Sequence, residues 1–144
     1  MAKTTRSRSI AASREAVWAI VSDPNHLPRW WPGVTRIEDI RGGHFTQVIP
    51  TRRGKPVRLD FRVLESEPPS RVSWTQELAG TPFERLLSAW TTTITLEPAA
   101  GGACVVTVEE HQQLRGTFRA GLLLQRRPAS RRLESALGSL AALF

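Results

Sequence analysis

The middle of the chain alternates between hydrophobic and polar positions. The clearest case is residues 57–64, where Leu59, Phe61 and Val63 are separated by charged residues. A period of two places alternate side chains on opposite faces of a β-strand, so this segment predicts a strand with one buried face and one hydrated face. Five further segments show the same period and are predicted as strands: residues 34–40, 45–49, 72–78, 90–96 and 104–108. Short turns separate these strands, which favours an antiparallel meander.

Helical spacing precedes this alternating region. Hydrophobic residues recur at intervals of three and four between positions 16 and 21. Ser13 can cap this helix, because its hydroxyl accepts a hydrogen bond from an amide of the first turn. A second short helix is expected before Pro32, and the polar segment at residues 4–10 predicts a first strand.

Helical spacing returns after the strands, from about residue 117. The residues of one hydrophobic stripe are Phe118, Leu122, Ala129, Leu133, Leu137 and Leu140. A sheet with one apolar face needs a cover, so we expect a long C-terminal helix to pack on it. Pro128 predicts a kink or a break in that helix, because proline lacks an amide hydrogen and clashes with the preceding turn.

The order of these elements defines an α+β fold class. We expect a curved antiparallel sheet of about seven strands, two short helices, and a long C-terminal helix that covers the apolar face of the sheet. The chain of 144 residues is close to the commonest size of one domain, so residues 1–144 are predicted to form a single domain.

Two stretches of residues resemble a known family. The first runs from Ile10 through Val17-Trp18 and Asp23-Pro24 to Trp30-Trp31-Pro32-Gly33-Val34, and the second joins Val63-Leu64-Glu65, Pro68-Pro69, Arg71-Val72 and Trp74. With the terminal helix, they resemble the helix-grip fold of the START-like (SRPBCC) superfamily, which includes the Bet v 1 allergens and the polyketide cyclase/dehydrase and lipid-transport group. The resemblance implies a cavity that accepts a lipid, a polyketide or a similar apolar small molecule. It does not define a reaction, because the fold carries several functions.

In such a fold the inner face of the sheet lines the cavity, and this selects the candidate ligand-binding residues. They are Trp30, Trp31, Leu59, Phe61, Val63, Trp74, Gln76, Phe83, Trp90, Thr92 and Leu122. Most are apolar, and Gln76 and Thr92 are the polar members expected to face inward. An alternative is that Trp74 and Trp90 only fill the core, since aromatic residues dominate cores and sites alike.

The end of the last predicted strand carries the candidate catalytic residues Glu109, Glu110 and His111. If Val106 and Val108 point inward, Glu110 does as well; the opposite phase turns Glu109 and His111 inward. A carboxyl group buried there would suit proton transfer. A charged strand end emerging into solvent is the alternative, and the alternation alone leaves the phase open. No pair of histidines has zinc-ligand spacing, so neither a metal nor another cofactor is expected.

The charge and the cysteine content of the chain limit its possible partners and its expected location. The net charge of +7 is spread over the chain, apart from Arg126, Arg127, Arg131 and Arg132. An acidic carrier protein is therefore a candidate partner, whereas nucleic acid is disfavoured. A single cysteine excludes an internal disulfide, and no segment has the ~20 apolar residues that cross a bilayer, so we expect a cytoplasmic protein with no transmembrane segment. The oligomeric state is not predicted.

Three functions follow in order of preference. The first is a carrier or sensor that binds an apolar small molecule, and the second is an enzyme of the polyketide cyclase/dehydrase type that acts on an aromatic or polyketide substrate. The third is an interaction module that uses the arginine cluster.

Overall fold

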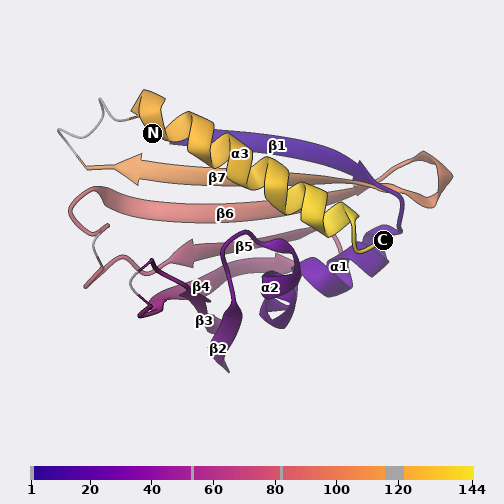
Figure 1. Ribbon diagram of the computed structural model, residues 1–144. Helices are drawn as coiled ribbons and strands as arrows, with labels where there is room; N and C mark the ends of the chain where they lie inside the picture. The colour runs from indigo at the N-terminus through magenta and orange to yellow at the C-terminus, as the bar shows by residue number, and fades with distance from the viewer. Residues whose placement is uncertain (1, 53, 82, 116–121) are drawn as a thin grey trace.

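The computed structural model describes residues 2–52, 54–81, 83–115 and 122–144; the side chains of Ala2 and of residues 122–128 are outside this description. Seven antiparallel strands form one sheet in the order β1-β7-β6-β5-β4-β3-β2 (Figure 1). The strands are β1 Ala2–Ile10, β2 Arg36–Arg41, β3 His44–Ile49, β4 Val57–Glu67, β5 Arg71–Gln76, β6 Leu87–Pro98 and β7 Cys104–Leu114. This sheet and the C-terminal helix that it grips confirm the predicted fold class.

The helices lie between β1 and β2, between β6 and β7, and at the end of the described chain. They are α1 Arg14–Val21, the 3₁₀ helix η1 Pro24–His26, α2 Leu27–Trp30, the short 3₁₀ turn η2 Ala100–Gly102, and α3 Leu122–Ala141. Ser13 caps α1 as predicted, since its Oγ accepts a hydrogen bond of 3.1 Å from the amide of Ala16. The expectation of a break at Pro128 is wrong: α3 runs as one helix through that position.

Helix α3 crosses one face of the sheet diagonally and contacts β1, β7 and α2 (Figure 1). The C-terminal part of α3 and the sheet together form a dense group of side chains, each with at most 2% of its surface exposed. We call this group the packed half; it consists of Ile94, Leu96, Cys104, Val106 and Val108 from the sheet and Leu133, Leu137 and Leu140 from α3. Burial raises the pKa of the Cys104 thiol, so this cysteine behaves as a core residue rather than a nucleophile.

The opposite edge of the sheet is held by exposed ion pairs. Arg58 Nη2 lies 2.6 Å from Asp39 Oδ2, and Arg36 Nε lies 2.7 Å from Glu38 Oε1. Arg58 also pairs with Glu38. The guanidinium groups of Arg36 and Arg58 hold the pKa of the Glu38 carboxyl below its usual value of 4.5. The two pairs made by Arg58 join β2 to β4 across the intervening strand, and the pair of Arg36 with Glu38 lies within β2.

Candidate functional site

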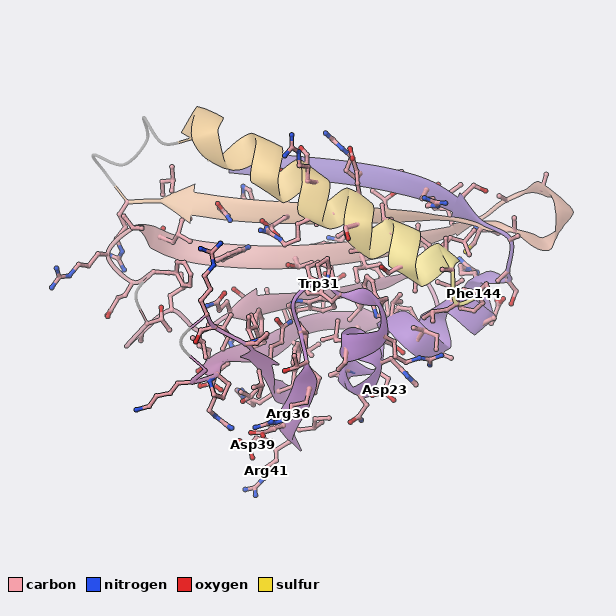
Figure 2. All side chains as sticks on the ribbon, viewed as in Figure 1. Asp23, Trp31, Arg36, Asp39, Arg41 and Phe144 are labelled. Carbon is pink, nitrogen blue, oxygen red and sulfur yellow. The ribbon has the colours of Figure 1, made fainter. Side chains whose placement is uncertain are left out.

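A cavity of about 200 Å³ lies on the inner face of the sheet, next to the packed half. It is lined by Trp31, Pro32, Gln47, Ile49, Leu59, Phe61, Trp74, Gln76, Phe83, Trp90, Thr92, Glu110 and Arg132. The sheet provides most of these residues, the loop after α2 provides Trp31 and Pro32, and α3 provides Arg132. Figure 2 shows Trp31 at that loop, whereas Arg36, Asp39 and Arg41 lie along β2.

The strand register brings the wall residues together. Thr92 on β6 lies directly opposite Trp74 on β5 and opposite Glu110 on β7. Residues that are directly opposite on neighbouring strands share a face of the sheet, so these three side chains form one row across the inner face. In the same way Gln47 lies opposite Leu59, and Phe61 lies opposite Gln76.

Aromatic rings form much of the wall. The ring centroids of Trp31 and Trp74 are 6.0 Å apart at an interplanar angle of 72°, and those of Phe83 and Trp90 are 5.5 Å apart at 87°. Such edge-to-face pairs hold the rings in fixed orientations. The cavity therefore has flat, rigid, apolar surfaces that suit a hydrophobic ligand.

The charged part of the cavity wall is built around Glu110 on β7, which is only 3% exposed. Its Oε1 pairs with the guanidinium of Arg132 and accepts a hydrogen bond of 3.2 Å from Gln112 Nε2. The guanidinium carbon of Arg132 also lies 5.6 Å from the centre of the Trp90 ring, within the range of a cation–π contact. Both contacts of the carboxylate within the described residues fall on Oε1.

A second polar group on the wall is Gln76. Its side chain is buried, and its Nε2 has no hydrogen-bond partner among the described residues. Gln47 and Thr92 are also buried at the cavity wall. Buried polar groups are normally paired, and the Nε2 atom of Gln76 is an exception among the described residues.

Most of the predicted ligand-binding residues line this cavity. They are Trp31, Leu59, Phe61, Trp74, Gln76, Phe83, Trp90 and Thr92. Trp30 does not: it is 2% exposed and packs edge-on against Trp31, with 5.3 Å between the ring centroids. Val63 is half-buried against the core outside the cavity, next to an irregularity in the pairing of β4 with β5. The side chain of Leu122 lies outside the described residues.

The last strand has the phase that turns Val106, Val108 and Glu110 inward. Glu109 and His111 therefore lie on the outer face, away from the cavity, which corrects their place among the candidate catalytic residues. The Oε2 atom of Glu109 is 3.6 Å from Lys3 Nζ there. Because Glu110 faces inward, alternation turns its two neighbours outward, since a strand cannot turn neighbouring residues to the same side.

The sequence reasoning missed Gln47 as a wall residue and placed Arg132 only in a basic cluster. For Gln47 the signal was its position two residues from both Phe45 and Ile49, which places all three side chains on one face of a strand. Arg132 precedes the buried Ala136 by four residues and Leu140 by eight, and this spacing puts it on the buried face of α3. The sequence reasoning did not place Arg132 on that face, because charged residues are seldom buried.

Metal binding and membrane insertion can each be considered for the described part of the chain. No group of three or more His, Cys, Asp or Glu side chains there could hold a metal ion. No helix among the described residues is long and apolar enough to cross a membrane.

A seven-stranded sheet gripping a C-terminal helix beside an apolar cavity defines a helix-grip protein of the START-like class. A family model described as "Polyketide cyclase / dehydrase and lipid transport" matches residues 1–144, and the chain belongs to that family. This confirms the resemblance seen in the sequence. A comparison with curated protein sequences finds no significant match.

Solved structures share the fold at low sequence identity. The di-domain ARO/CYC protein BexL from the BE-7585A biosynthetic pathway is similar with a TM-score of 0.80 and 22% identity, over 99% of this chain and 46% of BexL. XoxI from Bacillus cereus has a TM-score of 0.75 and 18% identity, over 100% and 96% of the two chains. A START superfamily protein from Mycobacterium smegmatis has a TM-score of 0.72 and 14% identity, over 99% of both chains.

Proposed function

We propose that this protein binds a small, largely apolar molecule in the cavity, as a carrier or sensor. The observation that carries the proposal is the composition of the cavity wall, which is mainly aromatic and aliphatic side chains with a few buried polar groups among them. Ligand sites commonly combine an apolar concavity with a small number of oriented polar groups. The family, whose description includes lipid transport, is consistent with this function.

An enzyme of the polyketide cyclase/dehydrase type is the second candidate, and Glu110 is the observation that favours it. Ring closure or dehydration needs a group that takes a proton from the substrate, and a carboxylate at the cavity wall can do this. However, Glu110 already pairs with Arg132 and Gln112, and Glu109 and His111 are on the other face. The expected convergence of two acid-base groups from this strand end is therefore missing, which favours binding over catalysis.

Binding in the cavity can be tested by filling it. Leu59→Trp places a large side chain in the cavity wall, and Leu64→Trp makes the same change at an exposed position of the same strand. With 2-acetylnaphthalene as the probe, we expect calorimetric titration to show binding to the wild type and to Leu64→Trp but not to Leu59→Trp. Equal binding by both variants would show that the probe sits elsewhere.

The natural ligand can distinguish the carrier hypothesis from the enzyme hypothesis. Native mass spectrometry of protein purified from its own host, compared with the denatured mass, should reveal a bound molecule. We expect that molecule to be recovered unchanged after prolonged incubation with fresh protein. A product that forms with the wild type and not with Glu110→Gln would instead establish the enzyme.

A further inference from the structure

A second pocket lies on the outer side of the sheet, beside the loop that joins β5 to β6. We call it the outer pocket; it has a volume of about 340 Å³ and shares only Gln76 with the cavity. Thr75 lines it and directly follows Trp74 of the cavity wall, so the outer pocket opens on the opposite face of the sheet. Its lining residues are Arg62, Thr75, Gln76, Leu78, Ala79, Glu84, Ser88, Ala89 and Arg115.

Two arginines from distant parts of the chain line the outer pocket. Arg62 on β4 lies directly opposite Thr75 on β5, so their side chains share the outer face. Arg115 follows β7 and is anchored at the start of β6, since its Nε donates a hydrogen bond of 3.3 Å to the carbonyl oxygen of Leu87. Its two Nη atoms have no hydrogen-bond partner among the described residues, so they remain available to a ligand.

The outer pocket carries an excess of positive charge. Neither Arg62 nor Arg115 forms an ion pair with a carboxylate of the described residues, whereas Arg71, elsewhere on the sheet, pairs with Glu65. The carboxylate that lines the pocket, Glu84, accepts a hydrogen bond of 3.2 Å from the amide of Gly80. Two cations at one pocket repel each other, and an anion bound between them removes that repulsion. The charge of the outer pocket therefore suits an anionic ligand.

The other side chains of the outer pocket limit what that anion can be. The Thr75 hydroxyl donates to the carbonyl oxygen of Trp90 at 3.1 Å, and the Ser88 hydroxyl donates to that of Gln113 at 3.2 Å. Recognition of the anion therefore falls to the two guanidinium groups. The single negative charge of Glu84 disfavours a ligand with a second anionic group. Apolar surface for a small carbon group is provided by Leu78, Ala79 and Ala89.

A phosphate monoester matches this arrangement better than a carboxylate. Each guanidinium is a rigid fork of donors, and one fork normally occupies both oxygens of a carboxylate. A phosphate monoester has three terminal oxygens and close to two negative charges at neutral pH, so it can accept hydrogen bonds from two forks at once. We propose that the outer pocket binds the phosphate group of a small phosphate monoester between Arg62 and Arg115. This site is separate from the cavity and does not depend on the function proposed for it.

The experiment titrates phenyl phosphate into the ¹⁵N-labelled full-length protein at low salt and about pH 7.5, with amide chemical shifts as the readout. Arg62→Met and Arg115→Met should each weaken binding by about five- to twentyfold, because each removes charge-assisted hydrogen bonds at an exposed site. Arg62→Lys keeps the charge but loses the fork, so its dissociation constant should lie between those of the wild type and Arg62→Met. Inorganic phosphate should bind more weakly than phenyl phosphate, since it has no carbon group; equal or tighter binding would overturn the assignment to a monoester.

Two variants serve as controls. Arg29→Met removes the same charge from an exposed position of α2, on the helical side of the sheet, and should bind phenyl phosphate like the wild type. Leu59→Trp fills the cavity and should also keep wild-type affinity for phenyl phosphate. An equal loss in Arg29→Met would show only a general attraction to a basic protein, and a loss in Leu59→Trp would place the probe in the cavity. Either result, or no binding to the wild type, would overturn the proposal and leave the cavity's binding of 2-acetylnaphthalene as a separate question.

Discussion

The inner face of strand β7 passes through two different environments. Cys104, Val106 and Val108 have no exposed surface and belong to the packed half under α3. Glu110 and Gln112 continue the same face along the same strand, but they are polar, and Glu110 borders the cavity. On β6 the change is similar, from Ile94 and Leu96 in the packed half to Trp90 and Thr92 at the cavity.

This difference shows that one sheet face carries two functions side by side. Close packing stabilises the fold, because each buried methylene group contributes free energy and each void removes it. A wall that borders a cavity lacks part of that stabilisation, because empty space and polar groups replace some of the buried apolar contacts. Substitutions in the two regions should therefore have different consequences, and the following predictions test this.

The largest expected effect is that of Leu133→Ala in the packed half. Leu133 has no exposed surface, and its truncation leaves a new void, so we expect a loss of about 2–5 kcal/mol in the free energy of unfolding. The same change at the cavity, Leu59→Ala, should cost about 1–2 kcal/mol, because space already exists beside that side chain. Denaturant unfolding measures both. Equal losses would mean that the two regions do not differ in packing.

An intermediate effect is expected for Arg132→Met at the boundary between α3 and the cavity. The variant leaves the buried Glu110 carboxylate without its cation, and removing one partner of a buried pair is strongly destabilising. Because the Arg132 side chain is 30% exposed, we expect a loss of about 2–3 kcal/mol, below the range for fully buried pairs.

The double variant Arg132→Met/Glu110→Gln provides the control for this effect. It removes the negative charge of Glu110, which the single variant leaves unpaired. Chemical denaturation should therefore show that most of the stability is recovered. If the single variant is as stable as the wild type, the ion pair does not hold α3 to the sheet.

The smallest effect is expected at the sheet edge, outside both regions. The pKa of Glu38 is lowered by Arg36 and Arg58, so its ionised form stabilises the fold above its usual pKa of 4.5, and this contribution disappears as the pH falls through the lowered value. Glu38→Gln should therefore be slightly less stable than the wild type at pH 7, with no difference at strongly acidic pH. Thermal unfolding at several pH values tests this, and high salt should reduce the difference, since the pairs are exposed.

The sequence contained most of the information about the fold. Period-two alternation located the strands, and the clean alternation of Leu59, Phe61 and Val63 placed two of these three on the cavity wall. The capping role of Ser13 was also predictable, because a cap depends only on neighbouring residues. Local patterns were reliable wherever local geometry decided the outcome.

The rest of the site depended on long-range packing. The phase of β7 was undecided between Glu110 and its neighbours until the contact with α3 was known. Arg132 was named only as a member of the basic cluster of the C-terminal helix, but its pairing with Glu110 makes the inward position favourable. Pro128 was expected to kink or break the helix, yet the helix continues through that position.

The row formed by Trp74, Thr92 and Glu110 on three adjacent strands has a practical consequence for protein engineering. Its middle position, Thr92, faces the cavity while the packed half is built from other residues of the same strands. Random libraries at Thr92 and Gln47 should therefore retain folded members at a high rate and still sample new ligand preferences. In evolutionary terms, such a sheet can change the residues of its cavity wall without first acquiring compensating mutations.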